Sequence, residues 1–300
     1  QVDMTGDAFQ RPVTSAIPEL LTMIEPLRET FRARWEKLLI QWSDLWNESN
    51  CPLPALPTAG EWLQIFLDTR QPTAILVCDA LRYDIAKRLE EQINTREGTQ
   101  RASIAPARTA LPTITALGMR MALPIPETQL QASYDGNTWH LIEQDSQIDL
   151  AQADGRRAWL RRSGLVADDG CITSVEALRG QIPAPSRTRK HILITDSVLD
   201  RLGHDDELEM LGSGLALDRY YDMIINLRTA GWRRIAIVTD HGFIHWSGNS
   251  EPRQTPIPGA IYRSRRALGF PPEAQLTQPH SYAPGGSWKI VAARGASCWS

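Results

Sequence analysis

The sequence has few cysteines, and none of them is spaced as a metal ligand or a redox pair. There are four, without a C-x-x-C motif among them: Cys51, Cys78, Cys171 and Cys298. Cys78 lies inside an apolar run that is typical of a buried strand. We therefore predict ordinary reduced thiols, which excludes a disulfide scaffold and a cysteine-ligated zinc site.

The sequence also lacks a long apolar run and a strong excess of either charge. No run approaches the roughly 18 residues of a membrane-spanning helix, and no basic leader precedes an apolar stretch. The formal net charge is only −3, so the protein cannot coat nucleic acid by bulk electrostatics, although a local basic groove is not excluded. We expect a soluble, cytoplasmic protein without membrane contact.

The hydrophobic content of 42% over 300 residues is enough for a substantial core. Between Ile17 and Trp46 the apolar residues recur with the three-and-four spacing of an amphipathic helix, and the prolines of "CPLPALPTAGEW" follow it. We predict an N-terminal helical segment and linker over residues 1–60 and one domain over 61–300. The chain starts with Gln1 and ends without a helix stop, so we expect a segment of a longer protein.

Four short apolar runs after the linker are predicted to be strands of one sheet: "TAILVCD", "RASIAPA", "HILITD" and "RIAIVTD". Helical patterns separate them, and Gly231 is placed as the stop of the last helix. This alternation predicts an α/β fold with a mainly parallel sheet. Residues 125–187 lose this regular pattern, with polar stretches, glycines and "PAPSRTRK" at the end, and we predict an irregular insertion there.

Three of these predicted strands end on aspartate: Asp79, Asp196 and Asp240. The carboxyl ends of parallel strands meet at one edge of a sheet, where ligands bind in open α/β folds. His241 follows Asp240 directly, and a D-x-x-G-H motif runs from residue 200 to 204, where Gly203 is expected to let the backbone turn. We therefore expect several acidic and imidazole side chains to converge.

Carboxylate and imidazole ligands together suit zinc, manganese or iron. Two such metals about 4 Å apart, held by about six ligands, can clamp the oxygens of a phosphoryl transfer. The candidate ligands are Asp79, Asp200, His204, Asp240 and His241, with Asp196, His245 and His280 in reserve. As alternatives, Asp79 and Asp196 could cap helices, and Asp200 with His204 could form a solvated acidic turn.

Threonines lie where a helix is expected to begin in "RTALPTITALGM": Thr109, Thr113 and Thr115. A helix N-terminus attracts anions, and a metal beside a threonine hydroxyl lowers its pKa enough to make it a nucleophile. A covalent phosphothreonine is therefore conceivable, although Thr113 could simply be an N-cap.

Four segments together resemble the PglZ domain family, a branch of the alkaline phosphatase superfamily known chiefly from BREX-type phage-defence systems. They are "VCDALRYD", "LPTITALGM", "DSVLDRLGHDD" and "VTDHGF", and the resemblance runs from about residue 72 to the end. It implies a three-layer α/β/α alkaline-phosphatase-like core with two metal sites and a serine or threonine nucleophile. The N-terminal helical segment would precede this core.

The resemblance also implies roles for single residues. The first metal would take Asp79, Asp240 and His241, and the second would take Asp200 and His204. Thr115 would be the nucleophile, with Thr113 as the alternative, and Arg82 would contact phosphate through its guanidinium fork or brace its helix. Family members commonly carry a late histidine where this chain has Ala293, so the second metal loses an expected ligand.

The first hypothesis is a metal-dependent phosphohydrolase, of the phosphodiesterase or nuclease type, within a BREX-type defence complex. It would hold one or two divalent ions, zinc or manganese, with other phage-defence proteins as partners and a nucleotide or nucleic acid as substrate. The alternative is a catalytically degenerate PglZ domain that serves as a scaffold for partner proteins. A third, weaker hypothesis is a phosphate-carrying mutase.

Overall fold

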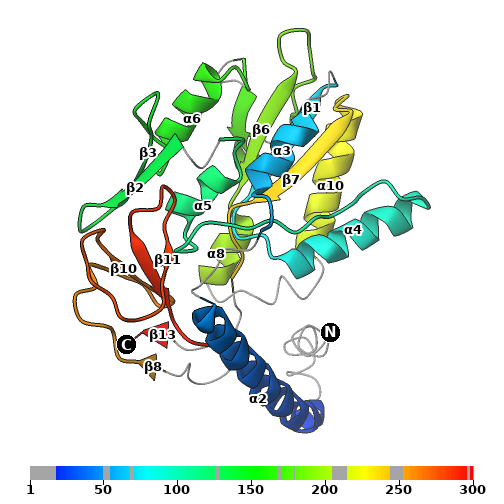
Figure 1. Cartoon of the computed structure of the whole chain (residues 1–300). Helices are drawn as coiled ribbons and strands as arrows, with labels where there is room; N and C mark the ends of the chain where they lie inside the picture. The colour runs from blue at the N-terminus through cyan, green and yellow to red at the C-terminus, as the bar shows by residue number, and fades with distance from the viewer. Residues whose placement is uncertain are drawn as a thin grey trace.

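The computed structural model describes most of the chain (Figure 1). The described residues are 18–49, 55–67, 71–125, 129–167, 171–178, 180–204, 215–243, 253–295 and 298–299.

A four-stranded parallel sheet forms the centre of the fold. Its strand order is β5 (Ile172–Ser174), β6 (His191–Asp196), β1 (Thr73–Cys78) and β7 (Arg234–Thr239). Cys78, the last residue of β1, pairs with Asp196 on one side and Thr239 on the other. Three strands therefore end level with one another, and the residues that follow them share one edge of the sheet.

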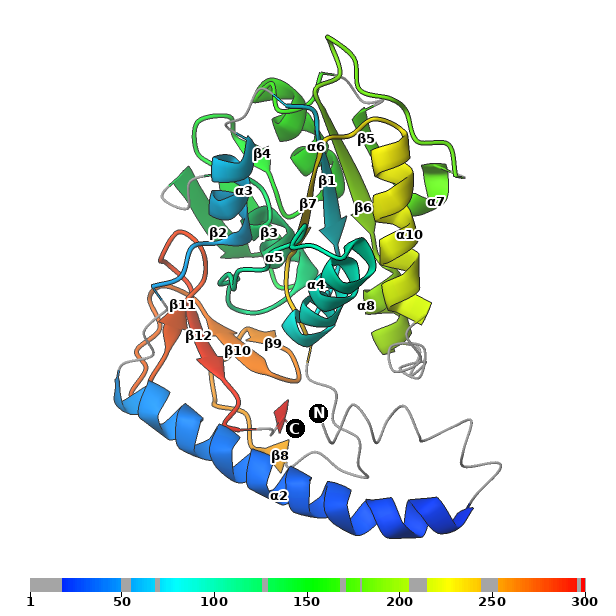
Figure 2. The ribbon, with the colours of Figure 1, turned by 90° about the vertical axis from the view of Figure 1, so that its right-hand side faces the viewer.

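Helices cover both faces of this sheet, because every residue of β1 is buried and its side chains alternate between two cores. One core packs α3 (Ala59–Leu67) and α5 (Thr115–Met121) against the sheet. The other packs α4 (Tyr83–Glu97), α8 (Val198–His204) and α10 (Leu215–Thr229). Figure 2 shows these layers on either side of β1 and β7, which confirms the predicted three-layer α/β/α architecture.

The strand predicted at "RASIAPA" is wrong. Residues 101–107 have no regular secondary structure and are mostly exposed. The run is alanine-rich and Pro106 lacks an N–H, so the segment has little to bury and cannot complete a ladder. Its continuation forms a single bridge, between Arg108 and Thr58.

Residues 125–187, predicted as an irregular insertion, contain regular elements. An antiparallel sheet combines β2 (Leu130–Tyr134), β3 (Trp139–Glu143) and β4 (Ile148–Asp149). The helices α6 (Ala153–Arg162) and α7 (Val175–Leu178) flank β5, which joins the central sheet. This segment therefore contributes to the core of the fold, while the division of the chain into domains stays a prediction.

The C-terminal part adds strands that the sequence did not indicate. An antiparallel sheet has the order β11 (Ser281–Tyr282), β12 (Lys289–Ala292), β10 (Ala267–Phe270) and β9 (Tyr262–Arg263). A pair combines β8 (Arg253–Gln254) with β13 (Cys298–Trp299). An aromatic cluster joins this region to the β2–β3 sheet through Tyr134, Trp139, Tyr262 and Trp288.

The predicted N-terminal helix is α2 (Pro18–Glu48), which lies beside β8 and β13 in Figures 1 and 2. The Gly295 N–H donates to Ser43 Oγ at 2.9 Å, and Arg294 forms two hydrogen bonds to Asp44. Several large apolar side chains of α2 are nevertheless exposed, among them Met23, Leu27, Leu38, Trp42 and Leu45. In the described part of the chain, no helix is both long and apolar enough to cross a membrane.

Candidate metal centre and nucleophile

The turn between β1 and α4 holds Asp79 at the edge of the sheet. Its N–H donates to the Asp196 carbonyl at 2.7 Å, so Asp79 continues the β1–β6 pairing by one residue. The next residue, Ala80, has a φ of 60°, which is costly for a residue with a Cβ. Hydrogen bonds stabilise this conformation, because Ala80 N–H donates to Asp240 Oδ1 and Leu81 N–H donates to Thr239 Oγ1, each at 3.1 Å.

Asp79, Asp240 and His241 form the only group of three acidic, histidine or cysteine ligands that the described residues bring together. One ligand atom from each lies within 4.8 Å of the others. His241 Nε2 is 3.3 Å from Asp240 Oδ2 and 3.8 Å from Asp79 Oδ1. The convergence expected from the ends of β1 and β7 is therefore present.

The facing atoms of this group are buried and lack hydrogen-bond donors. Asp79 Oδ1 and Asp240 Oδ2 have no hydrogen-bond partner among the described residues. Burial, followed by the charge of Asp240, raises the pKa of Asp79 to about 8. His241 Nδ1 lies 3.1 Å from the Gly242 carbonyl, to which only an N–H can bond, so in the neutral imidazole Nε2 is the acceptor. Three acceptors that face one another fit a divalent cation with mixed oxygen and nitrogen ligands.

The side chain of Thr115 faces this group from the first turn of α5. Its Oγ1 lies 3.3 Å from His241 Nε2. Helix α5 lies so close to the end of β7 that a Cβ on Gly118 would meet the Asp240 carbonyl oxygen at 2.8 Å. The alternative nucleophile, Thr113, is exposed and precedes the helix. The geometry therefore favours Thr115 over Thr113.

Comparison with protein-family models matches residues 61–267 to the BREX system PglZ alkaline phosphatase-like domain. The chain belongs to the PglZ family. The match covers more than half of the chain and includes β1, α5, β6 and β7, which position the group described above. Comparison with curated proteins finds no match.

The predicted second ligand pair, Asp200 and His204, is described only in part. Asp200 lies in α8, and its charge contributes to the raised pKa of Asp79, so the two carboxylates influence each other. It does not belong to the three-residue group. Gly203 lies within α8 and forms no turn, which corrects the expectation for D-x-x-G-H. The side chain of His204 lies outside the described part of the chain.

Two of the reserve ligands, Asp196 and His280, do not join the group that the described residues form. Asp196 accepts hydrogen bonds from Arg219 at 2.9 Å and from the Tyr220 hydroxyl at 2.8 Å. His280 Nδ1 lies 3.0 Å from the Gln278 carbonyl. His245 lies outside the described residues. Ala293, at the position of the late histidine, bonds through its N–H to the Arg266 carbonyl beyond the end of β12.

The guanidinium of Arg82, expected to contact phosphate or to brace its helix, contacts neighbouring side chains instead. It donates to both carboxylate oxygens of Asp84 at 2.9 and 2.8 Å, and its guanidinium lies 5.3 Å from the centre of the Phe243 ring. These contacts agree with the bracing alternative, because the bidentate fork is already used.

One charged residue that acts on the site was not predicted from the sequence: Arg156, a half-buried cation on α6. The positive charge of Arg156 lowers the pKa of Asp79, which places it within electrostatic reach of the candidate metal ligands. The helical pattern of "ADGRRAWLRR" could have indicated its helix, but nothing in the sequence indicated that the charge of Arg156 acts on Asp79.

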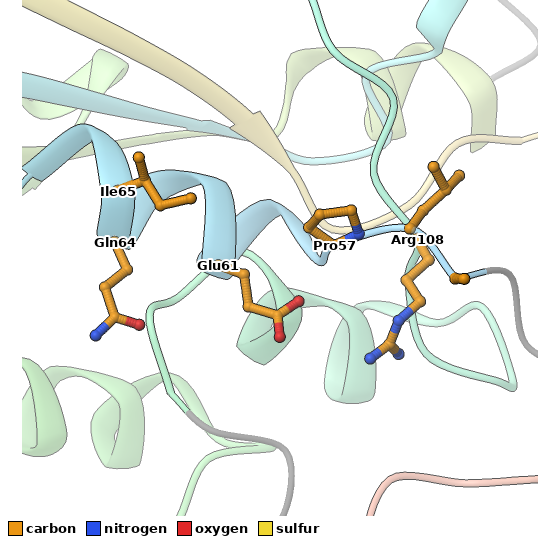
Figure 3. A pocket seen from close by; sticks show the side chains of 7 residues that line it. Pro57, Glu61, Gln64, Ile65 and Arg108 are labelled. Atoms are coloured by element: carbon orange, nitrogen blue, oxygen red, sulfur yellow. The ribbon is translucent and has the colours of Figure 1, made fainter.

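A surface pocket outside this group lies where α3 begins (Figure 3). It is lined by Ala55, Leu56, Pro57, Glu61, Gln64, Ile65 and Arg108, none of which is a predicted site residue. It therefore adds nothing to the candidate metal centre.

Proposed function

We propose that this PglZ domain is a metal-dependent phosphohydrolase of the phosphodiesterase type, with Thr115 as its nucleophile. The observation that carries the proposal is that two buried carboxylate oxygens without hydrogen-bond donors converge on His241 Nε2, which lies 3.3 Å from the Thr115 hydroxyl oxygen. The alkaline phosphatase-like family supports the same class of chemistry.

Asp79, Asp240 and His241 would hold the divalent cation, for which zinc or manganese suits the oxygen and nitrogen ligands. When bound, the ion would lower the pKa of the neighbouring hydroxyl and offset negative charge on a phosphoryl group. Asp200 and His204 are the candidates for a second ion. One ion is the minimum, since the described residues bring together one three-ligand group.

Thr115 would act by attack of its Oγ on phosphorus. The new Oγ–P bond forms as the bond to the leaving oxygen breaks; the threonine proton passes to solvent, and the leaving oxygen takes up a proton from solvent. Water then attacks the phosphothreonine, which releases a phosphate monoester and restores the hydroxyl. A nucleotide or nucleic-acid bond in a cytoplasmic, BREX-type defence complex is the substrate we propose.

The experiment compares Thr115→Val with Thr113→Val in hydrolysis of a generic phosphodiester, with metal content measured on both proteins. We expect Thr115→Val to retain metal and to lose at least about 100-fold in turnover, because valine keeps the shape but lacks the nucleophile. Thr113→Val should stay within about twofold of the parent, as expected for an exposed substitution. Parent-level turnover in Thr115→Val would refute the assignment.

A scaffold function is the second candidate, favoured by the exposed apolar side chains of α2. Exposed apolar clusters mark interaction surfaces in many proteins, and other phage-defence proteins are the partners we propose. Hydrolysis that a chelator abolishes would favour the enzyme. A protein that takes up no metal and cleaves no phosphodiester would favour the scaffold.

A further inference from the structure

The hydroxyl of Thr239, the last residue of β7, is hydrogen-bonded to two different segments of the chain. It accepts from the Leu81 N–H at 3.1 Å. It also donates to the His241 carbonyl at 2.8 Å. Leu81 lies two residues after Asp79, so this one hydroxyl joins the turn that carries one candidate ligand to the backbone of another.

Side-chain oxygens continue the pairing of β1 with β7 beyond the ends of the two strands. Cys78 and Thr239 are the last paired residues of the ladder. After them, Asp240 Oδ1 accepts from the Ala80 N–H at 3.1 Å and from the His241 N–H at 2.8 Å. Because Oδ1 is used by the backbone, Asp240 presents its other oxygen, Oδ2, to His241 Nε2 at 3.3 Å. The backbone hydrogen bonds therefore determine which atoms face a cation.

The candidate ligand atoms cannot themselves hold the two segments at a fixed spacing. In the ionised form that binds a metal, Asp79 Oδ1, Asp240 Oδ2 and a neutral His241 Nε2 are all acceptors, and acceptors do not hydrogen-bond to one another. The spacing between residues 79–81 and residues 240–241 thus depends on hydrogen bonds made by other atoms. The Thr239 hydroxyl supplies one of these bonds to each segment.

We propose that Thr239 is a positioning residue of the candidate metal centre, whose hydroxyl fixes the spacing between the Asp79 turn and His241 before a cation binds. The inference rests on the proposed function, because it concerns the same site. Ligands that are held in place by neighbouring hydrogen bonds bind a metal more tightly, since binding does not have to order them. The same bond restrains the backbone of His241, whose Nε2 lies 3.3 Å from the Thr115 hydroxyl oxygen.

The rival explanation is that Thr239 only stabilises the two turns. Both explanations predict a loss of stability when the hydroxyl is removed, so stability alone cannot separate them. Only positioning predicts a loss of metal affinity greater than that of a variant destabilised elsewhere in the sheet.

Thr73 provides the matched control. It is buried at the start of β1, at the opposite end of the sheet from Asp79, and its hydroxyl donates to the Gln71 carbonyl at 3.1 Å. Thr73→Val therefore makes the same chemical change as Thr239→Val, in a strand residue that also bonds to a backbone carbonyl, but far from the candidate ligands.

The experiment uses the full chain as parent, with Thr239→Val, Thr239→Ser and Thr73→Val. Manganese is titrated by calorimetry into each metal-free protein, and the urea midpoint of unfolding is measured on the same samples. We expect Thr239→Val to bind manganese about 10- to 100-fold more weakly than the parent. Thr239→Ser should bind like the parent, because serine keeps both hydrogen bonds. Thr73→Val should unfold at a lower urea concentration than the parent but bind manganese with the parent's affinity.

Manganese affinity equal to the parent in Thr239→Val would overturn the inference and leave the proposed function standing. An equal loss of affinity in Thr239→Ser or in Thr73→Val would also overturn it, because the loss would then not come from the hydroxyl at this position. If Thr239→Val does not fold, Thr239→Ala, which removes the hydroxyl without adding a second methyl group, decides by the same criterion. A parent protein that takes up no manganese would overturn both the inference and the proposed function.

Discussion

The ends of β1 and β7 differ from the end of β6, although an aspartate lies at each and all three meet at one edge of the sheet. Asp196, at the end of β6, is saturated by Arg219 and Tyr220. Asp79 and Asp240, next to β1 and β7, each keep a buried oxygen without a hydrogen-bond partner among the described residues. The same sequence signal thus produces a structural carboxylate in one place and a candidate ligand in the other.

The difference follows from what packs against each strand end. Helix α10 brings a cation and a hydroxyl to Asp196. At β1 and β7 the neighbours are His241 Nε2 and the Thr115 hydroxyl. A buried carboxylate oxygen without a donor costs free energy, and two such oxygens beside His241 Nε2 fit a bound cation.

The largest effect is expected when Asp240 is replaced, because this tests whether it is a metal ligand, unlike the structural Asp196. Asp240→Asn keeps an oxygen that can accept from the Ala80 and His241 N–H groups, but it removes a charge from the three-ligand group. We expect metal content to fall below detection and phosphodiester hydrolysis to be lost. Elemental analysis of protein purified without chelator checks this.

Asp196→Asn is the matched control for that substitution. It weakens the bonds from Arg219 and Tyr220, so we expect a loss of about 1–3 kcal/mol in unfolding free energy with metal content unchanged. The comparison between the strand ends fails if both variants lose metal, or if neither does.

The second prediction concerns the pH dependence of the metal-free protein. The pKa of Asp79 is about 8 in the folded protein, because of burial and then of Asp240, and about 3.9 in the unfolded chain. A raised folded pKa favours the protonated form on folding. The contribution of Asp79 to stability is therefore fully present below about pH 4 and is lost as the pH rises through about 8.

Asp79→Asn should remove this dependence, because an amide does not ionise. Chemical unfolding of metal-free protein at pH 5 and pH 8 measures it, and the parent should lose on the order of 3 kcal/mol relative to Asp79→Asn over that interval. Asp196→Asn again serves as control and should follow the parent. If the unfolding free energies of the parent and of Asp79→Asn change in parallel with pH, the pKa of Asp79 is not raised in the folded protein.

The sequence was sufficient to predict much of the fold, because long periodic elements carry their own signal. Helices α2, α4 and α10 and strands β1, β6 and β7 lie where the patterns indicated. The strand β5 was missed because it has only three residues, all half-exposed. A strand of that length is too short for a periodicity to be recognised. The run at 101–107 was mistaken for a strand because it contains alternating apolar residues, although it buries little in the folded protein.

Only those residues of the candidate site that lie at the ends of strands could be predicted from the sequence. The convergence of Asp79, Asp240 and His241 follows from parallel pairing, which the sequence indicated. The partners that distinguish one charged residue from another come from packing between distant segments. Neither the hydrogen bonds from α10 to Asp196 nor the effect of the Arg156 charge on Asp79 is encoded in local spacing.

The smallest expected effect tests how closely α5 must approach the end of β7. In Gly118→Ala the added Cβ would lie 2.8 Å from the Asp240 carbonyl oxygen and 3.3 Å from its Cβ. The contact is with backbone, so the helix or the strand end must move, and we expect a loss of about 1–3 kcal/mol in unfolding free energy. Because Asp240 and Thr115 move apart or tilt, metal affinity and turnover should also fall.

Gly203→Ala is the matched control, since it also replaces a helical glycine beside the site. Among the described residues its Cβ would meet only Phe243 Cζ, at 4.0 Å, so alanine has room against them. The substitution should stabilise α8 by about 0.5–1 kcal/mol through helix propensity. Thermal unfolding and metal titration of both variants test this prediction. If Gly118→Ala is as stable as Gly203→Ala and binds metal like the parent, close contact between α5 and Asp240 is not needed to form the site.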